Sequence, residues 1–288
     1  MADLTVIILT KNEEANIEKC IRSLRGIARR IAVIDSGSTD RTAEIAKECG
    51  AEVFSHPFRS HAEQFNWAAE AIRPDTEWIM KLDADEELTE ELAREMEERL
   101  DSLPGTVNGV ILRRRVYFMG RWLRHGGKYP ELLLRIFRRG HGASEMKQMD
   151  EHLILQDGET VTFRNDFLDM NNKPLEWWIA KHNWYSGKEV YEQRRPREEK
   201  DAEEEQLSGQ AKVKRFIKNH GYYSLPLFFR AHLYYLYRYY LRLGFLDGKE
   251  GKIYTFLQAY WYRYLVDAKL YECDKNGTEP ERPGDLKT

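Results

Sequence analysis

Hydrophobic residues in the first hundred positions follow two alternating spacings. Residues 4–9 form a continuous apolar run rich in β-branched side chains, which is typical of a buried parallel strand. Similar short runs predict strands at 31–34, 52–55 and 78–82. Apolar residues three or four positions apart predict helices at 12–24, 38–49, 61–72 and 87–100. This alternating order predicts an α/β fold, with a mostly parallel sheet covered by helices on both faces.

Polar residues follow three of the predicted strands directly. Thr10, Asp35 and Asp83 each lie just past the carboxyl end of a strand. In sheets of this kind ligands bind beyond the carboxyl ends of the strands. We therefore expect the binding site at this edge.

The run Lys-Leu-Asp-Ala-Asp-Glu-Glu at 81–87 carries the clearest chemistry. Asp83 and Asp85, on a tight loop after a strand, suit a hard divalent cation such as Mg²⁺ or Mn²⁺. Such a cation neutralises the charge that builds on a departing diphosphate. The alternative is that these acids only begin the next helix and complement its dipole. Their place after a strand and the motifs upstream favour the metal.

Two upstream motifs also lie at strand ends. Leu-Thr-Lys-Asn-Glu-Glu occupies 9–14, and Val-Ile-Asp-Ser-Gly-Ser-Thr-Asp occupies 33–40. The Asp35 carboxylate can accept hydrogen bonds from a nucleobase or a ribose. An equally good interpretation is a plain strand-turn-helix junction capped by Ser38 or Asp40, and Asn12 would likewise cap the first helix.

The pattern changes after Gly109. Strands are predicted at 110–114 and 132–137 in a more mixed sheet, followed by a helix at 176–192. Residues 207–272 hold 18 aromatic residues and 11 Lys or Arg against 4 Asp or Glu. We therefore divide the chain into a catalytic domain (1–192), a charged linker or helix (193–206), a helical aromatic and basic segment (207–272) and a flexible tail (273–288).

Within that segment, the spacing of residues 230–243 fits an interfacial helix with two faces. Arg230, Arg238 and Arg242 fall on one arc. The opposing side carries Leu233, Leu236, Tyr240 and Leu243. This pattern predicts reversible attachment to a membrane surface through 207–272. The alternatives are packing on the catalytic domain and pairing of two subunits.

Composition excludes several other classes. A formal net charge of -3 argues against a nucleic-acid binder. Three cysteines without a C-x-x-C motif predict neither a disulfide framework nor structural zinc, which fits a reducing cytosol. No signal peptide or spanning helix is predicted. We expect a cytoplasmic protein, or one at the inner face of the cell membrane.

Taken together, the motifs at 9–14, 33–40 and 81–86 resemble family 2 glycosyltransferases of the GT-A fold, in order and spacing. The remainder resembles a branch related to lipopolysaccharide-core β-glucosyltransferases. The matching stretches are 134–139, 149–152, 181–183 and 244–248.

The resemblance implies roles for individual residues. Asp85 would be the principal metal ligand, and Asp83 would contact the metal or the ribose. The implied nucleotide-sugar-binding residues are Thr10, Asn12, Glu13, Asp35, Gln64, Asn66 and Asp83. From their charge, Arg135 and Arg138 are candidates for the diphosphate or an anionic acceptor, or else they pair with surface acids.

The implied reaction is inverting transfer of one sugar from a nucleotide-diphosphate sugar, by family default a UDP-sugar, to a glycan or lipid-linked acceptor. Glu151 is the preferred catalytic base and Asp150 the alternative. A nucleotidyltransferase would share the fold and metal, but it normally has a Gly-rich loop where this chain has Thr-Lys-Asn-Glu-Glu. A non-catalytic nucleotide-binding protein is the third possibility.

Overall fold

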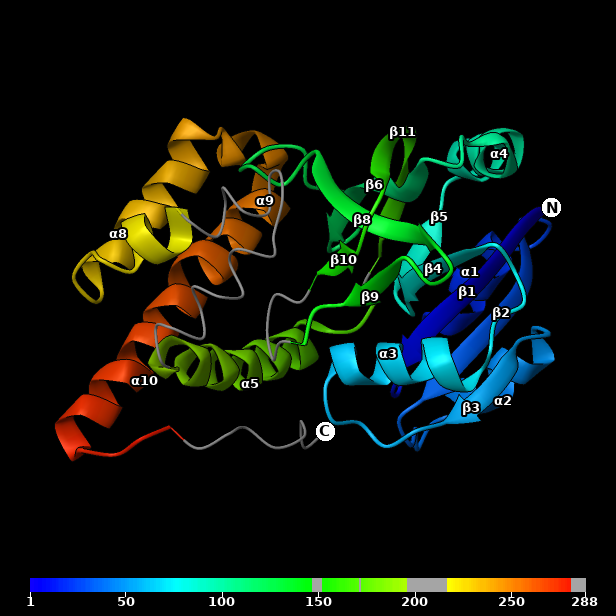
Figure 1. Cartoon of the computed structure of the whole chain (residues 1–288). Coiled ribbons are helices and arrows are strands. Elements are labelled where there is room, and N and C mark those ends of the chain that lie inside the picture. The colour runs from blue at the N-terminus through cyan, green and yellow to red at the C-terminus, as the bar shows by residue number, and fades with distance from the viewer. Residues whose placement is uncertain (147–151, 171, 196–216, 281–288) are drawn as a thin grey trace. The chain divides into compact units, whose positions relative to one another are not determined.

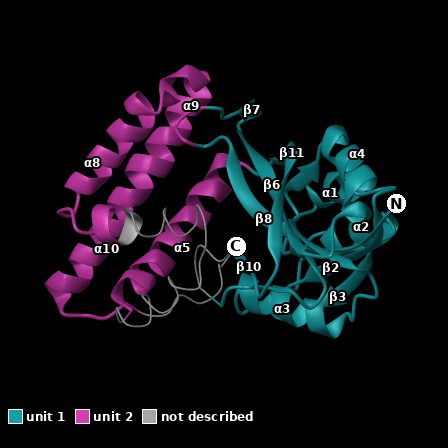
Figure 2. Cartoon of the chain, turned by 45° about the horizontal axis from the view of Figure 1, so that its top comes forward, with its two compact units in different colours: residues 1–124, 128–173 teal, residues 125–127, 174–288 magenta. Residues whose placement is uncertain are grey.

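The structure is a computed structural model, and it describes residues 1–146, 152–170, 172–195 and 217–280. The chain forms two compact units (Figure 2). Unit 1 comprises residues 1–124 and 128–173, and it contains the sheet. Unit 2 comprises residues 125–127 and 174–288, and its described elements are helical.

The first four long strands of unit 1 are parallel. They are β1 (Ala2–Thr10), β2 (Ala28–Asp35), β3 (Glu52–Ser55) and β4 (Trp78–Asp83), in the spatial order β3-β2-β1-β4. All four agree with the strands predicted from the apolar runs. Because they are parallel, their carboxyl ends meet at one edge of the sheet.

The sheet continues as a mixed half through β8 (Glu131–Arg138), β6 (Val107–Phe118), β11 (Glu159–Asp169) and β5 (Glu86–Leu88). Strand β8 is antiparallel to both β4 and β6, whereas β6 and β11 are parallel. The short strand β7 (Arg121–Trp122) pairs with β6, while β9 (Gly142–Ser144) and β10 (Leu153–Leu155) form a separate ladder. The fold class expected from the sequence is confirmed, including the mixed second half.

Helices cover both faces of the sheet (Figure 1). On one face lie α1 (Ile17–Ser23), α2 (Thr42–Glu48) and α4 (Glu90–Arg99), continued by the 3₁₀ turn η1 (Leu100–Ser102). On the other lies α3 (His61–Ala71). The strands supply both cores by alternation: Val6 and Ile8 face the first, and Ile7 and Leu9 the second. Burial on both faces explains why these strands are apolar throughout.

Unit 2 is a set of helices. They are α5 (Leu175–Arg194), η2 (Ile217–Tyr222), α8 (Phe229–Leu236), η3 (Tyr237–Leu241), η4 (Gly244–Asp247), α9 (Gly248–Thr255), η5 (Phe256–Trp261) and α10 (Tyr262–Asn276). Ion pairs join them: the buried Arg230 of α8 contacts the buried Asp267 of α10 at 2.5 Å, and the half-buried Arg263 of α10 contacts Glu189 of α5 at 2.5 Å. Long-range pairs therefore tie this unit together as well as apolar packing.

Several predicted helix boundaries are wrong. Asn12 has φ 53°, so it cannot begin the first helix, which starts at Ile17. Residues 86–88 form β5, and α4 begins only after Thr89, whose side chain caps it. The helix predicted from residue 38 starts at Thr42. In each case the loop residues that follow a strand make side-chain contacts of their own instead of helical turns.

The interfacial helix predicted from the spacing of residues 230–243 ends before the last two of them. The chain there is α8 and η3, followed by Leu243 in the left-handed region and the turn η4. Arg230 does not lie on an exposed arc, since it is 2% exposed against Asp267. Arg238 is half-buried and donates to the Tyr234 hydroxyl at 2.6 Å.

The two compact units divide the chain at residue 173, so α5 groups with the helical unit. The sequence placed the end of the catalytic domain at 192. Compactness says which residues pack together and not where catalysis ends, so the domain boundaries stay a prediction. Among the described residues, no helix is both long and apolar enough to cross a membrane.

Candidate active site

The strand register brings three predicted site residues together. Thr10 at the end of β1 is opposite Asp35 at the end of β2, and Leu9 is opposite Asp83 at the end of β4. Neighbouring strands in a sheet lie about 4.8 Å apart. The prediction that these side chains share one edge of the sheet is therefore confirmed.

Hydrogen bonds cross-link the loops after β1 and β2. The Asn12 amide oxygen accepts from the Thr39 backbone N–H at 2.8 Å, and the Asn12 N–H donates to the Ser38 hydroxyl at 2.9 Å. The Asp35 carboxylate accepts from the backbone N–H groups of Gly37 and Ser38 at 3.1 and 3.0 Å. Asn12 and Asp35 thus hold the shape of this edge, whatever ligand contacts they also make.

Thr10 differs from these residues because its hydroxyl is unsatisfied. The side chain is 5% exposed, and its Oγ1 has no hydrogen-bond partner among the described residues. A buried hydroxyl without a partner costs free energy, commonly about 1–3 kcal/mol. Such a group at a strand exit is well suited to accept or donate a hydrogen bond to a ligand.

Glu86 and Arg135 hold the start of the loop after β4 in place. The Glu86 carboxylate accepts from the Asp83 backbone N–H at 2.9 Å. The Arg135 guanidinium donates to Glu86 at 2.5 Å and lies 3.6 Å from the Asp83 carboxylate. Because Arg135 is 6% exposed, it is a buried counter-charge of the loop.

This counter-charge sets the ionisation of Asp83. Burial raises the pKa of the Asp83 carboxyl, but the positive charges of Arg135 and Lys81 outweigh it and hold the pKa at about 2. Burial acts in the same direction on Glu86, and there it prevails, so the pKa of Glu86 is raised despite Arg135. Asp83 therefore carries a full negative charge at neutral pH.

Asp85 is the least engaged carboxylate of the loop. It is half-buried, and no hydrogen bond or ion pair among the described residues ends on its side chain. Asp85 also affects the pKa of Glu13. Burial is the largest cause that raises this pKa, and the nearby Asp85 carboxylate is the second. Lys173, whose ammonium donates to Glu13 at 2.6 Å, acts in the opposite direction.

These residues fit a hard divalent cation. Asp85 has unused carboxylate oxygens beside the ionised Asp83, and oxygen ligands of this kind suit Mg²⁺ or Mn²⁺. Within the described ranges, no group of three His, Cys, Asp or Glu side chains is arranged as a metal site. A cation held here would therefore need oxygen ligands from a bound substrate or water as well.

The side chains of Gln64 and Asn66, both in α3, are hydrogen-bonded to other parts of the protein. The Gln64 amide donates to the Ser36 hydroxyl at 2.6 Å, behind the exit of β2. Asn66 exchanges two hydrogen bonds with the backbone of Ser144 in β9, at 2.9 and 2.8 Å. Both side chains position neighbouring backbone in this structure.

Other predicted residues are not brought to this edge. Arg138 lies opposite Trp78, at the amino end of β4, where it stacks over the Trp78 ring and pairs with Glu77. Since Asp83 is at the other end of that strand, Arg138 is far along β4 from the acidic loop. Asp150 and Glu151 lie outside the described residues.

Three residues that sequence reasoning did not single out belong to the cluster. Glu86 was visible only as one acid in the run at 81–87, and nothing local marked it as buried. Arg114 lies 3.8 Å from Glu86 and 2.8 Å from Glu131. Lys173 reaches Glu13 from 160 positions away, so no local spacing could have predicted it.

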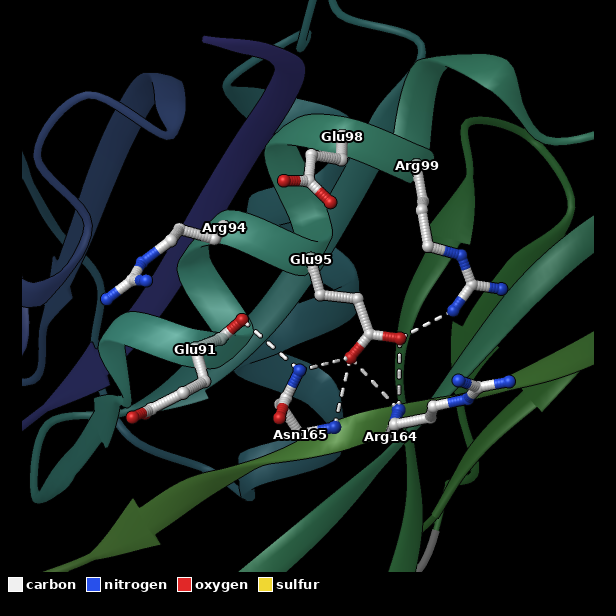
Figure 3. A pocket seen from close by; sticks show the side chains of 7 residues that line it. All are labelled: Glu91, Arg94, Glu95, Glu98, Arg99, Arg164 and Asn165. Atoms are coloured by element: carbon white, nitrogen blue, oxygen red, sulfur yellow. Dashed lines mark hydrogen bonds and ion pairs between the residues drawn. The ribbon is translucent and has the colours of Figure 1, made fainter.

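A separate pocket lies between α4 and β11, and it is not part of this edge (Figure 3). Six charged side chains and one amide line it: Glu91, Arg94, Glu95, Glu98, Arg99, Arg164 and Asn165. Glu95 fills its base and accepts from the backbone N–H groups of Arg164 and Asn165, each at 3.0 Å. These contacts join α4 to β11, so the charged residues of the pocket have a structural role.

The fold and the site together define an α/β enzyme-like protein with carboxylates at the strand exits and a cation-compatible acidic loop. The model of the family described as "Glycosyl transferase family 2" matches residues 5–168. This match covers more than half of the chain, so the chain belongs to glycosyl transferase family 2. This family membership supports a glycosyltransferase and not the nucleotidyltransferase that the sequence analysis considered.

Curated relatives agree over nearly the whole chain. The lipopolysaccharide core biosynthesis glycosyltransferase LpsC of Rhizobium meliloti is 30% identical over 93% of this chain and 92% of its own length. An uncharacterized glycosyltransferase of Rickettsia bellii is 28% identical over 99% of this chain and 92% of its own length. The resemblance to the lipopolysaccharide-core branch, stated from the sequence, is therefore confirmed.

Solved structures give a partial likeness only. The glucosyl-3-phosphoglycerate synthase of Mycobacterium tuberculosis, in complex with Mn²⁺ and uridine-diphosphate-glucose, is 25% identical with a TM-score of 0.33. The match covers 40% of this chain and 43% of that protein, which is less than half of either. The fold assignment above therefore depends on the strand topology and the family match.

Proposed function

We propose that this glycosyltransferase moves a single sugar, with inversion, from a UDP-sugar to an acceptor hydroxyl in lipopolysaccharide or a related cell-surface glycan. The main support is the acidic loop at the parallel strand exits, with an ionised Asp83 beside an unengaged Asp85. The lipopolysaccharide assignment of a relative aligned over 93% of this chain supports the acceptor class. UDP is the family's default nucleotide.

In this proposal the donor's nucleoside lies over the exits of β1 and β2. The unsatisfied Thr10 hydroxyl is available to it, and Asn12, Glu13 and Asp35 line the same edge. Gln64 and Asn66 would affect donor binding indirectly, because their hydrogen bonds position Ser36 and Ser144. Arg135 would act on the diphosphate indirectly, by positioning the acidic loop, because its guanidinium already contacts Glu86 and Asp83.

Asp85, with Asp83, would hold a divalent cation, Mn²⁺ or Mg²⁺. When bound, the cation supplies positive charge to the leaving diphosphate. The protein's own contribution is to keep the Asp83 carboxylate ionised and its backbone in place, through Glu86 and Arg135.

The transfer step needs one carboxylate base. The acceptor oxygen forms a bond to C1 of the sugar as the bond from C1 to the diphosphate breaks, and the hydroxyl proton passes to the base. We propose Glu151 for this role, with Asp150 as the alternative. A positioned base commonly contributes about 10²–10⁴ in rate.

A lipid-linked acceptor would place the reaction at a membrane surface on the cytoplasmic side. The exposed apolar residues of unit 2 support such a contact.

The test is incubation of the purified protein with a panel of nucleotide sugars and Mn²⁺, with and without lipopolysaccharide-core acceptors. We expect nucleoside diphosphate release that accelerates with one acceptor class, and a product with inverted anomeric configuration by NMR. A retained configuration would contradict inversion. Absence of both transfer and slow hydrolysis with every donor would contradict the proposal as a whole.

A further inference from the structure

Unit 2 contains a helical hairpin, residues 229–261. Its first arm is α8 with η3, its turn includes η4, and its second arm is α9 with η5. The arms lie side by side: the Tyr260 hydroxyl is 3.0 Å from the His232 ring nitrogen Nε2, and the rings of Tyr235 and Tyr260 also meet. Figure 1 shows the two arms as neighbouring helices.

The first arm exposes an apolar stripe. The exposed residues recur at helical spacing: Phe229, Leu233, Leu236 and Tyr240. Positions separated by four, three and four residues lie on one face of a helix. An exposed face of this kind, on a helix that could bury it, is typical of a contact surface.

The end of the first arm and the turn that follows it expose further large apolar side chains. We call Leu241, Leu243, Phe245 and Leu246 the apolar tip. Leu241 is 76% exposed, and the other three are each more than 40% exposed. Four large apolar side chains exposed to solvent within the six residues 241–246 are uncommon on a water-facing turn.

Hydrogen bonds to residues 125 and 126 of unit 2 hold the apolar tip in place. The buried Asp247 accepts from the His125 backbone N–H at 2.9 Å and lies 2.7 Å from the His125 ring nitrogen Nδ1. The Gly126 N–H donates to the Arg242 carbonyl at 2.7 Å. Leu243 has φ 58°, a conformation that costs a leucine about 1–2 kcal/mol. The chain thus holds apolar residues outward in a defined and strained turn.

Charge around these residues has one sign. The exposed Lys, Arg, Asp and Glu side chains of residues 229–261 are Arg242, Lys249 and Lys252, all basic. The two acids of the hairpin are the buried Asp247 and the half-buried Glu250. Lys252 precedes the exposed Ile253, with Phe256 one turn further on, so cationic and apolar groups share a face of the second arm. Arg242 lies within the tip sequence itself.

We infer that the hairpin docks on an anionic lipid surface, with the apolar tip among the headgroups and Arg242, Lys249 and Lys252 on lipid phosphates. Basic residues beside exposed leucine and aromatic side chains fit this occupant. A second copy fits less well, since the same face would bring like charges together. Docking depends on this surface alone, and it can fail or hold independently of the proposed transfer reaction.

The test is flotation of the purified protein with vesicles of phosphatidylcholine alone or with about 30% phosphatidylglycerol. We expect binding to the anionic vesicles at low salt and release at high salt. Leu241→Ser with Phe245→Ser should weaken binding about tenfold or more at every salt concentration. Tyr271→Ser, which removes an exposed aromatic residue outside the hairpin, should bind as the wild type does.

A charge variant separates the two parts of the surface. Lys249→Glu with Lys252→Glu should bind anionic vesicles at least tenfold more weakly. Arg25→Glu with Lys47→Glu changes net charge equally on exposed positions of unit 1, and it should leave binding nearly intact. Equal loss in both charge variants would reduce the effect to overall charge and overturn the inference. Wild-type failure to float, or a tip-dependent dimer in sedimentation, would also overturn it.

Discussion

At the scale of single residues, two carboxylates two positions apart meet different electrostatic conditions. Asp83 lies against Arg135 and Lys81, which hold its pKa at about 2 although burial raises it. Asp85 has no such partner among the described residues. A charged group without a counter-ion is the one that gains most from a bound cation. We therefore assign Asp85 the larger part in metal binding.

Asp85→Ala should abolish Mn²⁺-dependent UDP binding and lower transfer by about 10²-fold or more, because it removes the unengaged ligand. Stability should change little, since no intramolecular contact of the described residues is lost. Glu87→Ala, two positions along the same acidic run, is the matched control. Isothermal titration with UDP, with and without Mn²⁺, measures the effect. Unchanged Mn²⁺-dependent binding in Asp85→Ala would exclude this role.

Glu151→Gln should lower kcat by orders of magnitude while UDP-sugar affinity stays nearly constant. The amide keeps the shape of the side chain but cannot take the acceptor's proton. Asp150→Asn is the natural comparison, and steady-state kinetics with a fixed acceptor distinguishes the two. If only Asp150→Asn loses kcat, the base is Asp150.

At the scale of elements, α4 secures an irregular part of β11. Pairing between β6 and β11 shifts between Thr162 and Asp166, which leaves Arg164 and Asn165 out of the ladder. The Glu95 carboxylate accepts from both of their backbone N–H groups and from the Arg99 guanidinium (Figure 3). Burial raises the pKa of Glu95, but these hydrogen bonds outweigh it and the pKa is lowered.

Glu95→Gln should destabilise the protein by about 1–3 kcal/mol at pH 7, since charge-assisted hydrogen bonds to buried backbone are weakened. Because the folded-state pKa is lowered, this contribution is complete above the unfolded-state pKa, about 4.3, and is lost as pH falls through the folded value. Urea unfolding should therefore show a difference between variant and wild type that shrinks toward pH 3.

Glu98→Gln, one turn along the same helix and exposed, is the control for Glu95. It should stay within about 0.5 kcal/mol of the wild type. A pH-independent deficit in Glu95→Gln would show that its loss comes from packing and not from charge.

At the scale of the whole molecule, two units are stabilised in different ways. Unit 1 buries apolar residues on both faces of its sheet. Unit 2 has a smaller apolar cluster around Val190, Tyr262 and Val266, so its ion pairs between helices carry a larger share of the contacts that join its elements. Asp267, which is fully buried, accepts from both the Phe228 N–H and Arg230, at 2.7 Å in each case.

Asp267→Asn should cost unit 2 about 3–5 kcal/mol, because it leaves the buried Arg230 without its counter-charge. Hydrogen exchange followed by mass spectrometry can resolve the two units. We expect faster exchange in α8 and α10 and little change in β1 and β4. Asp274→Asn, at an exposed pair in α10, is the control. Equal acceleration in both units would mean that they unfold as one.

The sequence by itself determined the parallel half of the sheet and its functional edge. Short apolar runs rich in β-branched residues that alternate with helical patterns favour strands buried between two helical layers, so β1 to β4 follow from local pattern. Strand direction then places Thr10, Asp35 and Asp83 together without further information. The same local logic predicted α5, found at Leu175–Arg194.

Only the tertiary structure decided which charges meet. Arg135 and Arg138 are three residues apart in β8, yet one braces the acidic loop and the other lies at the amino end of β4, because β8 runs antiparallel to β4. Arg230 matched a surface arc by spacing, but Asp267, 37 positions away, draws it into the interior. Local spacing shows which residues share one face of a helix or strand. Which residues pack against that face depends on contacts between segments that are distant in the chain.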